Sequence, residues 1–117
     1  MNEGESAPPI AVSPEEWRII RSLLRRYLPE REVWAFGSRV AGEQRAYSDL
    51  DLVILGEGPI GIDRLAELAE AFSESDLPWK VDLLDWAELS GPFRERIRER
   101  KVVLQLGEKP SLGKSGG

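Results

Sequence analysis

Hydrophobic residues recur every three or four positions in two stretches of the chain, which predicts amphipathic helices there. The first stretch runs from residue 13 to about residue 28. It opens with Ser13-Pro14-Glu15-Glu16, a capping box with proline at the first helical position. The second stretch runs from residue 62 to about residue 73. Ser90-Gly91-Pro92 marks the start of a further helix, which should end near Arg100.

Short hydrophobic runs between these helices predict β-strands. The runs lie at residues 32–36, 50–55 and 79–84, with 102–106 as an optional last strand. A short helix and a loop are expected from residue 38 to residue 49. The resulting order, α-β-α-β-α-β-α, predicts an α/β (α+β) fold in which helices flank a small mixed sheet of three to four strands.

The chain has 117 residues, which is the size of one domain with a modest core. Both ends are rich in glycine, proline and polar residues and show no periodic pattern. We therefore expect a flexible N-terminal segment at residues 1–12, a folded domain at residues 13–106 and a flexible tail at residues 107–117.

The composition excludes several kinds of chemistry. Without cysteine or histidine the chain has no disulfide, thiolate nucleophile, Ser-His-Asp triad or ordinary zinc site. A net charge of −5, from 16 basic and 21 acidic residues, argues against nucleic acid as a direct ligand. No apolar run approaches the ~20 residues that span a bilayer, and the N-terminus lacks a signal-peptide core. We expect a cytoplasmic protein without a membrane partner.

Three aspartates on the predicted strands are the candidates for catalysis. Asp49 and Asp51 lie at the start of the second strand, and side chains alternate along a strand, so both carboxylates should lie on one face. A cation between them would relieve their repulsion, and hard oxygen ligands favour Mg²⁺ or Mn²⁺. An isolated Asp-x-Asp pair is, however, more often a turn cap or a surface charge. Asp82 lies within an apolar run, where a charge is costly unless it faces a site or a partner.

Phe36-Gly37-Ser38 places a glycine and a hydroxyl where the first strand should turn into the short helix. Backbone N–H groups at a helix start can receive phosphate oxygens, and glycine lets the backbone approach closely. The alternative is a glycine that ends a strand and a serine that caps a helix. The aspartate pair downstream favours the phosphate-binding interpretation.

Together these pieces resemble a known family. The segments are Gly37-Ser38-Arg39-Val40-Ala41-Gly42 and Ser48-Asp49-Leu50-Asp51-Leu52-Val53, with ten residues between Ser38 and the acid pair. This pattern is similar to that of the nucleotidyltransferase superfamily related to DNA polymerase beta, and most closely to its minimal members. The family has a third aspartate on a later strand, where Asp82 stands. The resemblance covers roughly residues 17–104 and implies the nucleotidyltransferase fold.

The resemblance also implies a role for each residue. The catalytic and metal-binding residues would be Asp49, Asp51 and Asp82, holding two Mg²⁺ ions or, alternatively, Mn²⁺. Asp82 would also help to deprotonate the attacking hydroxyl. The residues that bind the triphosphate of ATP would be Gly37, Ser38 and Arg39. For Arg39, pairing with a carboxylate is an equal alternative. Two metal ions would stabilise the attacking and leaving oxygens, and this reaction needs no histidine.

Small members of this family are usually encoded beside a helical HEPN protein, with which they form toxin–antitoxin pairs. The resemblance therefore implies an antitoxin that transfers AMP from ATP to a tyrosine of a partner HEPN ribonuclease toxin. HEPN ribonucleases carry a motif with histidine, so this chain cannot be the toxin. Two alternatives stay open. One is a small-molecule nucleotidyltransferase of the aminoglycoside-modifying kind that acts with a second subunit, and the other is a non-catalytic antitoxin that neutralises by contact.

Basic and aromatic residues outside this pattern carry predictions of their own. A stripe on the first helix is expected to face solvent and comprises Arg18, Arg21 and Arg25. Residues 94–101 interleave arginine with glutamate, which predicts a solvated helix, with docking of an acidic partner surface or RNA as the alternative. The aromatic residues expected to pack in the domain rather than to stack on bases are Trp34, Trp79 and Trp86.

Overall fold

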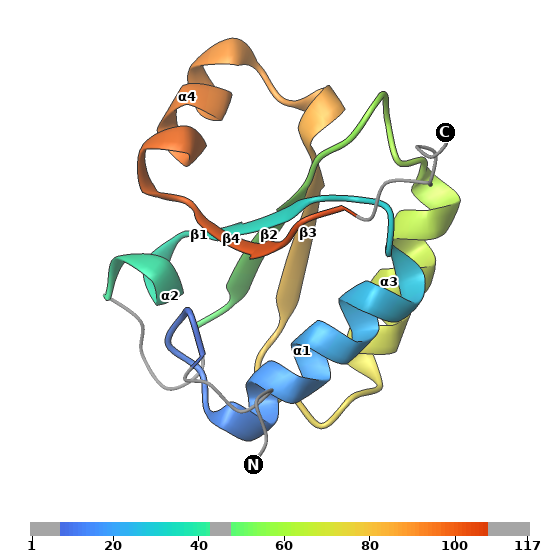
Figure 1. Cartoon of the computed structure of the whole chain (residues 1–117), viewed down its shortest axis with the longest axis vertical. Helices are drawn as coiled ribbons and strands as arrows, with labels where there is room; N and C mark the ends of the chain where they lie inside the picture. The colour runs from blue at the N-terminus through green and yellow to red at the C-terminus, as the bar shows by residue number, and fades with distance from the viewer. Residues whose placement is uncertain (1–7, 43–47, 108–117) are drawn as a thin grey trace, which may run out of the picture.

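A computed structural model describes residues 8–42 and 48–107 (Figure 1). Its elements are, in order, α1 (Pro14–Tyr27), β1 (Val33–Phe36), α2 (Ser38–Ala41), β2 (Leu50–Ile54), α3 (Ile62–Ser73), β3 (Val81–Asp85), the 3₁₀ helix η2 (Trp86–Glu88), α4 (Gly91–Arg100) and β4 (Val102–Gln105). The predicted order is confirmed, the optional last strand included. The third strand begins two residues later than predicted, because Val81 is the first residue to pair with β2, which itself begins at Leu50.

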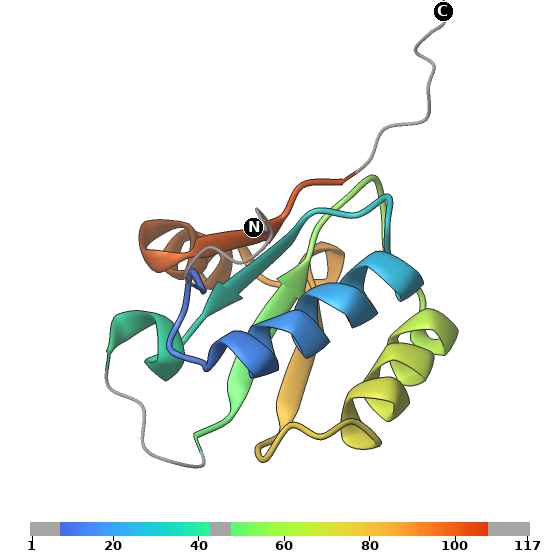
Figure 2. The ribbon, with the colours of Figure 1, turned by 60° about the horizontal axis from the view of Figure 1, so that its bottom comes forward.

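The four strands form one mixed sheet in the order β3-β2-β1-β4. Strand β1 is antiparallel to both β2 and β4, whereas β2 and β3 are parallel and are connected through α3. Helices α1 and α3 cover one face of the sheet and run in opposite directions, and α4 lies on the other face (Figures 1 and 2). A sheet covered on both faces explains why β2 is almost uniformly apolar.

Side-chain alternation along the strands divides the core into two clusters. On the α1 and α3 face, Leu50, Leu52 and Ile54 of β2 are fully buried. On the α4 face, Val53 packs with Ile97 of α4 in a smaller cluster. The smaller cluster covers only part of its face, and Asp51 lies on the same side of β2 as Val53. This end of the face is where the candidate site is built.

Capping fixes the start of α1 as the sequence predicts. The Ser13 hydroxyl accepts a hydrogen bond from the Glu16 backbone N–H (3.0 Å), and the Glu16 carboxylate accepts one from the Ser13 N–H (2.8 Å). The residues just before the cap differ from expectation. Residues 8–12 belong to the segment that the sequence predicts to be flexible, yet Ile10 is buried in the core and the Ala11 N–H donates to the Arg39 carbonyl. Residues 1–7 and 108–117, the rest of the predicted flexible ends, lie outside the described residues.

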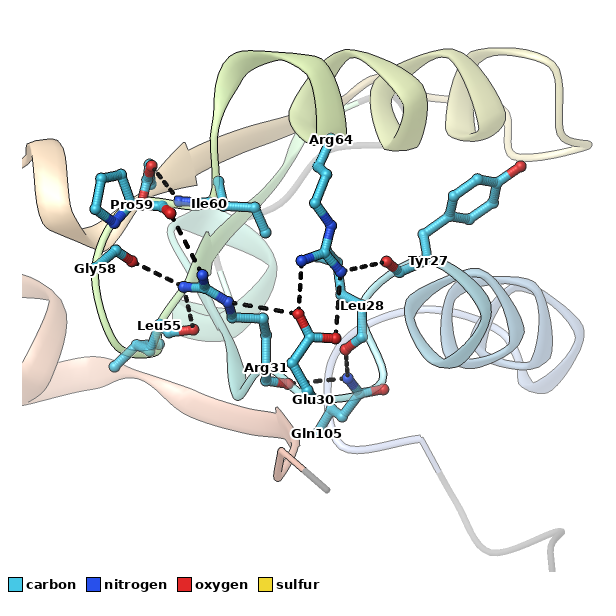
Figure 3. A network of polar contacts seen from close by, with 11 residues as sticks. Tyr27, Leu28, Glu30, Arg31, Leu55, Gly58, Pro59, Ile60, Arg64 and Gln105 are labelled. Atoms are coloured by element: carbon cyan, nitrogen blue, oxygen red, sulfur yellow. Dashed lines mark hydrogen bonds and ion pairs between the residues drawn. The ribbon is translucent and has the colours of Figure 1, made fainter. Parts of the chain in front are cut away.

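A polar network holds the end of the sheet farthest from the candidate site (Figure 3). The Arg31 guanidinium donates to the carbonyl oxygens of Gly58 (2.9 Å) and Leu55 (3.4 Å), and so ties the turn before β1 to the loop after β2. Close by, Glu30 pairs with Arg64 of α3 at 2.6 Å. Because Arg31 donates to three carbonyl oxygens at once, the network restrains the loop after β2.

The tryptophans pack as predicted. Trp34 and Trp79 are buried, and Trp86 is half-buried against Trp34, with the rings edge to face at 5.3 Å. Arg94 and Arg98 lie over the Trp86 ring at 5.0 and 5.2 Å, so part of segment 94–101 contacts the domain and is not simply solvated. Within the described ranges, no helix is both long and apolar enough to cross a membrane.

Candidate active site

The sheet topology brings the three aspartates to one end of the sheet. Strand β1 ends where β2 begins, and Phe36 is paired with Asp51. Strand β3 runs parallel to β2, and Asp82 is paired with the same Asp51. Directly paired residues project from the same face of a sheet, so the two carboxylates are neighbours on the α4 side. Asp49 precedes Asp51 by two residues and adds a third carboxylate.

The carboxylates act on one another electrostatically. The pKa of Asp51 is raised from its ordinary value of 3.8 to about 6, first by burial, then by the charges of Asp82 and Asp49 and by a hydrogen bond with Asp82. Asp49 and Asp82 are exposed, so the cluster opens to solvent. In residues 8–42 and 48–107, no three acidic side chains already enclose a common point closely enough to hold a metal ion. A cation shared by Asp49, Asp51 and Asp82 would require these side chains to reorient.

Gly37 lies against the acid cluster. Its φ of +90° is a conformation that other residues rarely adopt, and a Cβ there would collide with the Asp51 carboxylate. The chain enters α2 directly after Gly37, with Ser38 as the first residue of the helix. The start of α2 and the Asp51 carboxylate therefore lie side by side.

Comparison with known families identifies the family of the chain. The family described as polymerase beta nucleotidyltransferase matches residues 19–108, most of the chain. The chain belongs to this nucleotidyltransferase family. The resemblance inferred from the Gly-Ser and Asp-x-Asp motifs is therefore confirmed at the level of the family.

Individual relatives agree with this assignment. The chain is 53% identical over 98 residues to the probable protein adenylyltransferase MntA of Haemophilus influenzae, an alignment that covers 84% of this chain and 86% of the relative. Among solved structures, it is similar to a toxin–antitoxin structure with AMP-PNP, with a TM-score of 0.67 and 27% identity over 79% of this chain and 74% of the other. A variant of the toxin–antitoxin MntA-HpeT gives a TM-score of 0.64 and 29% identity over 80% and 73%. The predicted nucleotidyltransferase fold is confirmed.

In this nucleotidyltransferase Arg39 contacts Ser48, the residue directly before Asp49. Its side chain is buried, donates to the Ser48 carbonyl (3.0 Å) and the Ala11 carbonyl (2.8 Å), and stacks over the Trp79 ring at 4.2 Å. Burial lowers the pKa of Arg39, and the charge of Glu16 partly opposes this. These contacts favour a positioning role for Arg39 over direct contact with phosphate. The sequence offered no sign of them, because Ala11 and Trp79 are distant along the chain.

An aromatic pair beside the acids also escaped the sequence analysis. The ring of Phe36, the cross-strand neighbour of Asp51, meets the ring of Phe93 edge to face at 6.1 Å. Phe93 lies in the first turn of α4 and is 36% exposed. The pair gives the nucleotidyltransferase site an apolar wall. Only the position of Phe36 next to Gly37 could have signalled it.

Proposed function

We propose that this chain transfers AMP from ATP to a tyrosine hydroxyl of a partner HEPN ribonuclease and acts as the antitoxin of that pair. The observation that carries the proposal is the pairing of Asp51 with Asp82 on adjacent parallel strands, with Gly37 held against the Asp51 carboxylate. The name of the Haemophilus influenzae relative, probable protein adenylyltransferase, supports the reaction. The toxin–antitoxin structure with AMP-PNP supports both the nucleotide and the kind of partner.

The donor set fits a hard divalent cation. Asp49, Asp51 and Asp82 supply only carboxylate oxygens. The pKa of Asp51 is raised first by burial and then by the charges of Asp82 and Asp49, and a bound cation would offset both effects. We propose that these three residues hold two Mg²⁺ ions, which Mn²⁺ could replace. When bound, the ions would supply charge stabilisation for the attacking and leaving oxygens of an in-line displacement.

The chain's own residues would then bind and orient the triphosphate and accept the proton of the acceptor hydroxyl. Backbone N–H groups at Gly37 and Ser38 would contact the triphosphate, and Arg39 would keep the loop before Asp49 in place. The acceptor oxygen attacks the α-phosphorus, the bond from that phosphorus to the bridging oxygen breaks, and pyrophosphate leaves with the bonding electrons. The acceptor proton passes to Asp82, which is exposed and can release it to solvent.

The openness of the site favours a protein as the acceptor. Asp49 and Asp82 lie at the surface, whereas sites for small molecules bury most of their ligand. The open groove between α1 and α3 is lined by none of the three aspartates. A tyrosine presented on the surface of a second protein could reach exposed carboxylates without an enclosing pocket.

Mass spectrometry tests the proposal. The purified chain is incubated with a candidate HEPN partner, ATP and Mg²⁺, and the partner should gain the mass of AMP at a tyrosine. Asp49→Asn and Asp51→Asn should abolish the transfer while the fold survives. The matched control is Asp63→Asn on α3, an exposed acid outside the site, which should transfer normally.

Other outcomes separate the alternatives. Normal transfer by both active-site variants would overturn the proposed metal site. Neutralisation of the partner without any mass gain, and equally by the variants, would assign the chain to contact-only antitoxins. Transfer to an added aminoglycoside and not to the partner would assign it to small-molecule nucleotidyltransferases.

A further inference from the structure

An open groove of about 970 Å³ lies between α1 and the C-terminal end of α3. It is on the sheet face opposite α4 and includes none of the residues assigned to catalysis. Its lining contains four arginines of α1, the residues Arg18, Arg21, Arg25 and Arg26, and a single acidic residue, Glu74, directly after α3. In a chain of net charge −5, this is a local concentration of positive charge.

Three of these arginines form a stripe along α1. Arg18, Arg21 and Arg25 are three and four positions apart, so the three side chains share one face of α1. Arg25 is exposed and forms no ion pair with any residue in the described ranges. A carboxylate of a partner that covered this face could pair with Arg25.

The lining of the groove also contains apolar side chains, and these limit the kinds of partner that fit it. Leu23 and Tyr27 are half-buried against the core, and Ile19 and Ala71 are also half-exposed in the lining. A lining that combines arginine, tyrosine and apolar side chains, without lysine, is typical of protein interfaces. A nucleic acid backbone would contact the arginines but would leave the apolar side chains uncovered. The negative net charge of the chain would also oppose nucleic acid binding.

We propose that this groove docks an acidic, amphipathic segment of a protein partner. Carboxylates of the segment would pair with the arginines, and its apolar side chains would cover Leu23 and Tyr27. The groove and the catalytic acids are on opposite sides of the sheet, so docking and AMP transfer use separate surfaces. Naming the HEPN protein as the partner rests on the proposed function, whereas the chemistry of the groove does not.

The test compares two double charge reversals with the same change in net charge. Arg18→Glu/Arg25→Glu alters the groove, and Arg96→Glu/Arg100→Glu alters exposed positions on α4. The affinity of each variant for the purified HEPN partner is measured by isothermal titration calorimetry at two salt concentrations. Circular dichroism confirms that each variant is folded, and the milder Arg25→Gln serves if the groove reversal fails to fold.

The groove variant should bind the partner at least about tenfold more weakly, with a smaller salt dependence, and the α4 variant should bind within about twofold of the parent chain. Arg25→Gln should weaken binding by a smaller factor. At saturating partner the AMP transfer rate of the groove variant should equal that of the parent. Unchanged affinity in the groove variant, or an equal loss in the α4 variant, would overturn the proposal.

Two further outcomes keep the groove and the proposed reaction apart. Weaker binding by the groove variant, with no AMP transfer by any form of the chain, would sustain the groove and overturn the reaction. Normal AMP transfer, with the groove variant binding the partner as tightly as the parent does, would sustain the reaction and overturn the groove.

Fluorescence anisotropy with a labelled single-stranded RNA provides a check on the class of ligand. RNA binding that the groove variant alone abolishes would assign the surface to phosphate and overturn the protein partner.

Discussion

Replacing Asp51 by asparagine should make the metal-free protein more stable while it abolishes catalysis. The pKa of Asp51 in the folded chain, about 6, lies above its ordinary value of 3.8. Its contribution to stability is therefore fully present below pH 3.8 and is lost as the pH rises through about 6. At pH 7.5 the parent carries an unfavourable charge beside Asp82 and Asp49. The asparagine amide is neutral, similar in shape, and able to donate a hydrogen bond to Asp82.

The size of the effect follows from that pKa. A change from 3.8 to about 6 corresponds to at most about 3 kcal/mol of unfavourable free energy in the folded state. Asp51 is only half-buried, and solvent screening reduces this to about 1 kcal/mol. For a domain of this size, about 1 kcal/mol raises the Tm by roughly 4–8 °C.

Thermal unfolding at pH 7.5 in EDTA, followed by circular dichroism, measures this difference in Tm. Asp51→Asn should melt several degrees above the parent, and the gap should narrow at pH 5, where Asp51 of the parent is largely protonated. Mg²⁺ with ATP should stabilise the parent and not the variant. Asp76→Asn, at an exposed acid before β3, is the matched control and should change stability by less than about 0.5 kcal/mol. An Asp51 variant that melts with or below the parent in EDTA would refute the electrostatic account of the cluster.

Three more predictions follow from the same geometry. At sub-saturating Mg²⁺ the transfer rate should fall about tenfold per pH unit below about 6, because protonation removes Asp51 as a ligand; a pH profile of the rate that stays flat to pH 5 would contradict this. Gly37→Ala should lower the free energy of unfolding by about 1–3 kcal/mol in chemical denaturation and abolish ATP binding, because alanine is strained at this positive φ and its Cβ would collide with the Asp51 carboxylate. Normal ATP binding by this variant would show that the close approach is dispensable. Arg31→Ala should cost about 1–3 kcal/mol in the same denaturation assay but leave the transfer rate at 25 °C unchanged, because its carbonyl partners lie at the far end of the sheet; a slower enzyme with parental stability would reverse that assignment.

Local signals in the sequence were enough to predict the elements of the fold. Capping residues marked the start of α1 at Ser13 and of α4 at Ser90, and hydrophobic spacing gave α3 its bounds. The order of strands in the sheet carries no such signal, because it depends on which strands meet across the domain. Residues 8–12 illustrate the limit, since Ile10 packs on the core through contacts that their local composition does not reveal.

The same holds for the candidate site, where local geometry could be predicted from the sequence and long-range contacts could not. Alternation along one strand predicts that Asp49 and Asp51 share a face, which needs only local geometry. That Asp82 lies beside Asp51 requires β3 to be parallel to β2 in a particular register, and only the family resemblance suggested it. The stacking of Arg39 on Trp79 could not be predicted, because it joins segments far apart in the chain.

Binding of Mn²⁺ in the presence of ATP, followed by electron paramagnetic resonance, tests the central claim that Asp82 shares a cation site with Asp49 and Asp51. The parent chain should bind Mn²⁺, and Asp82→Asn should lose at least about tenfold in affinity although its fold is intact. Asp85→Asn is unsuitable as a control, because the Asp85 carboxylate accepts a buried hydrogen bond from the Ile60 N–H, so Asp63→Asn is used instead. Binding of Mn²⁺ by Asp82→Asn with the affinity of the parent would contradict the account.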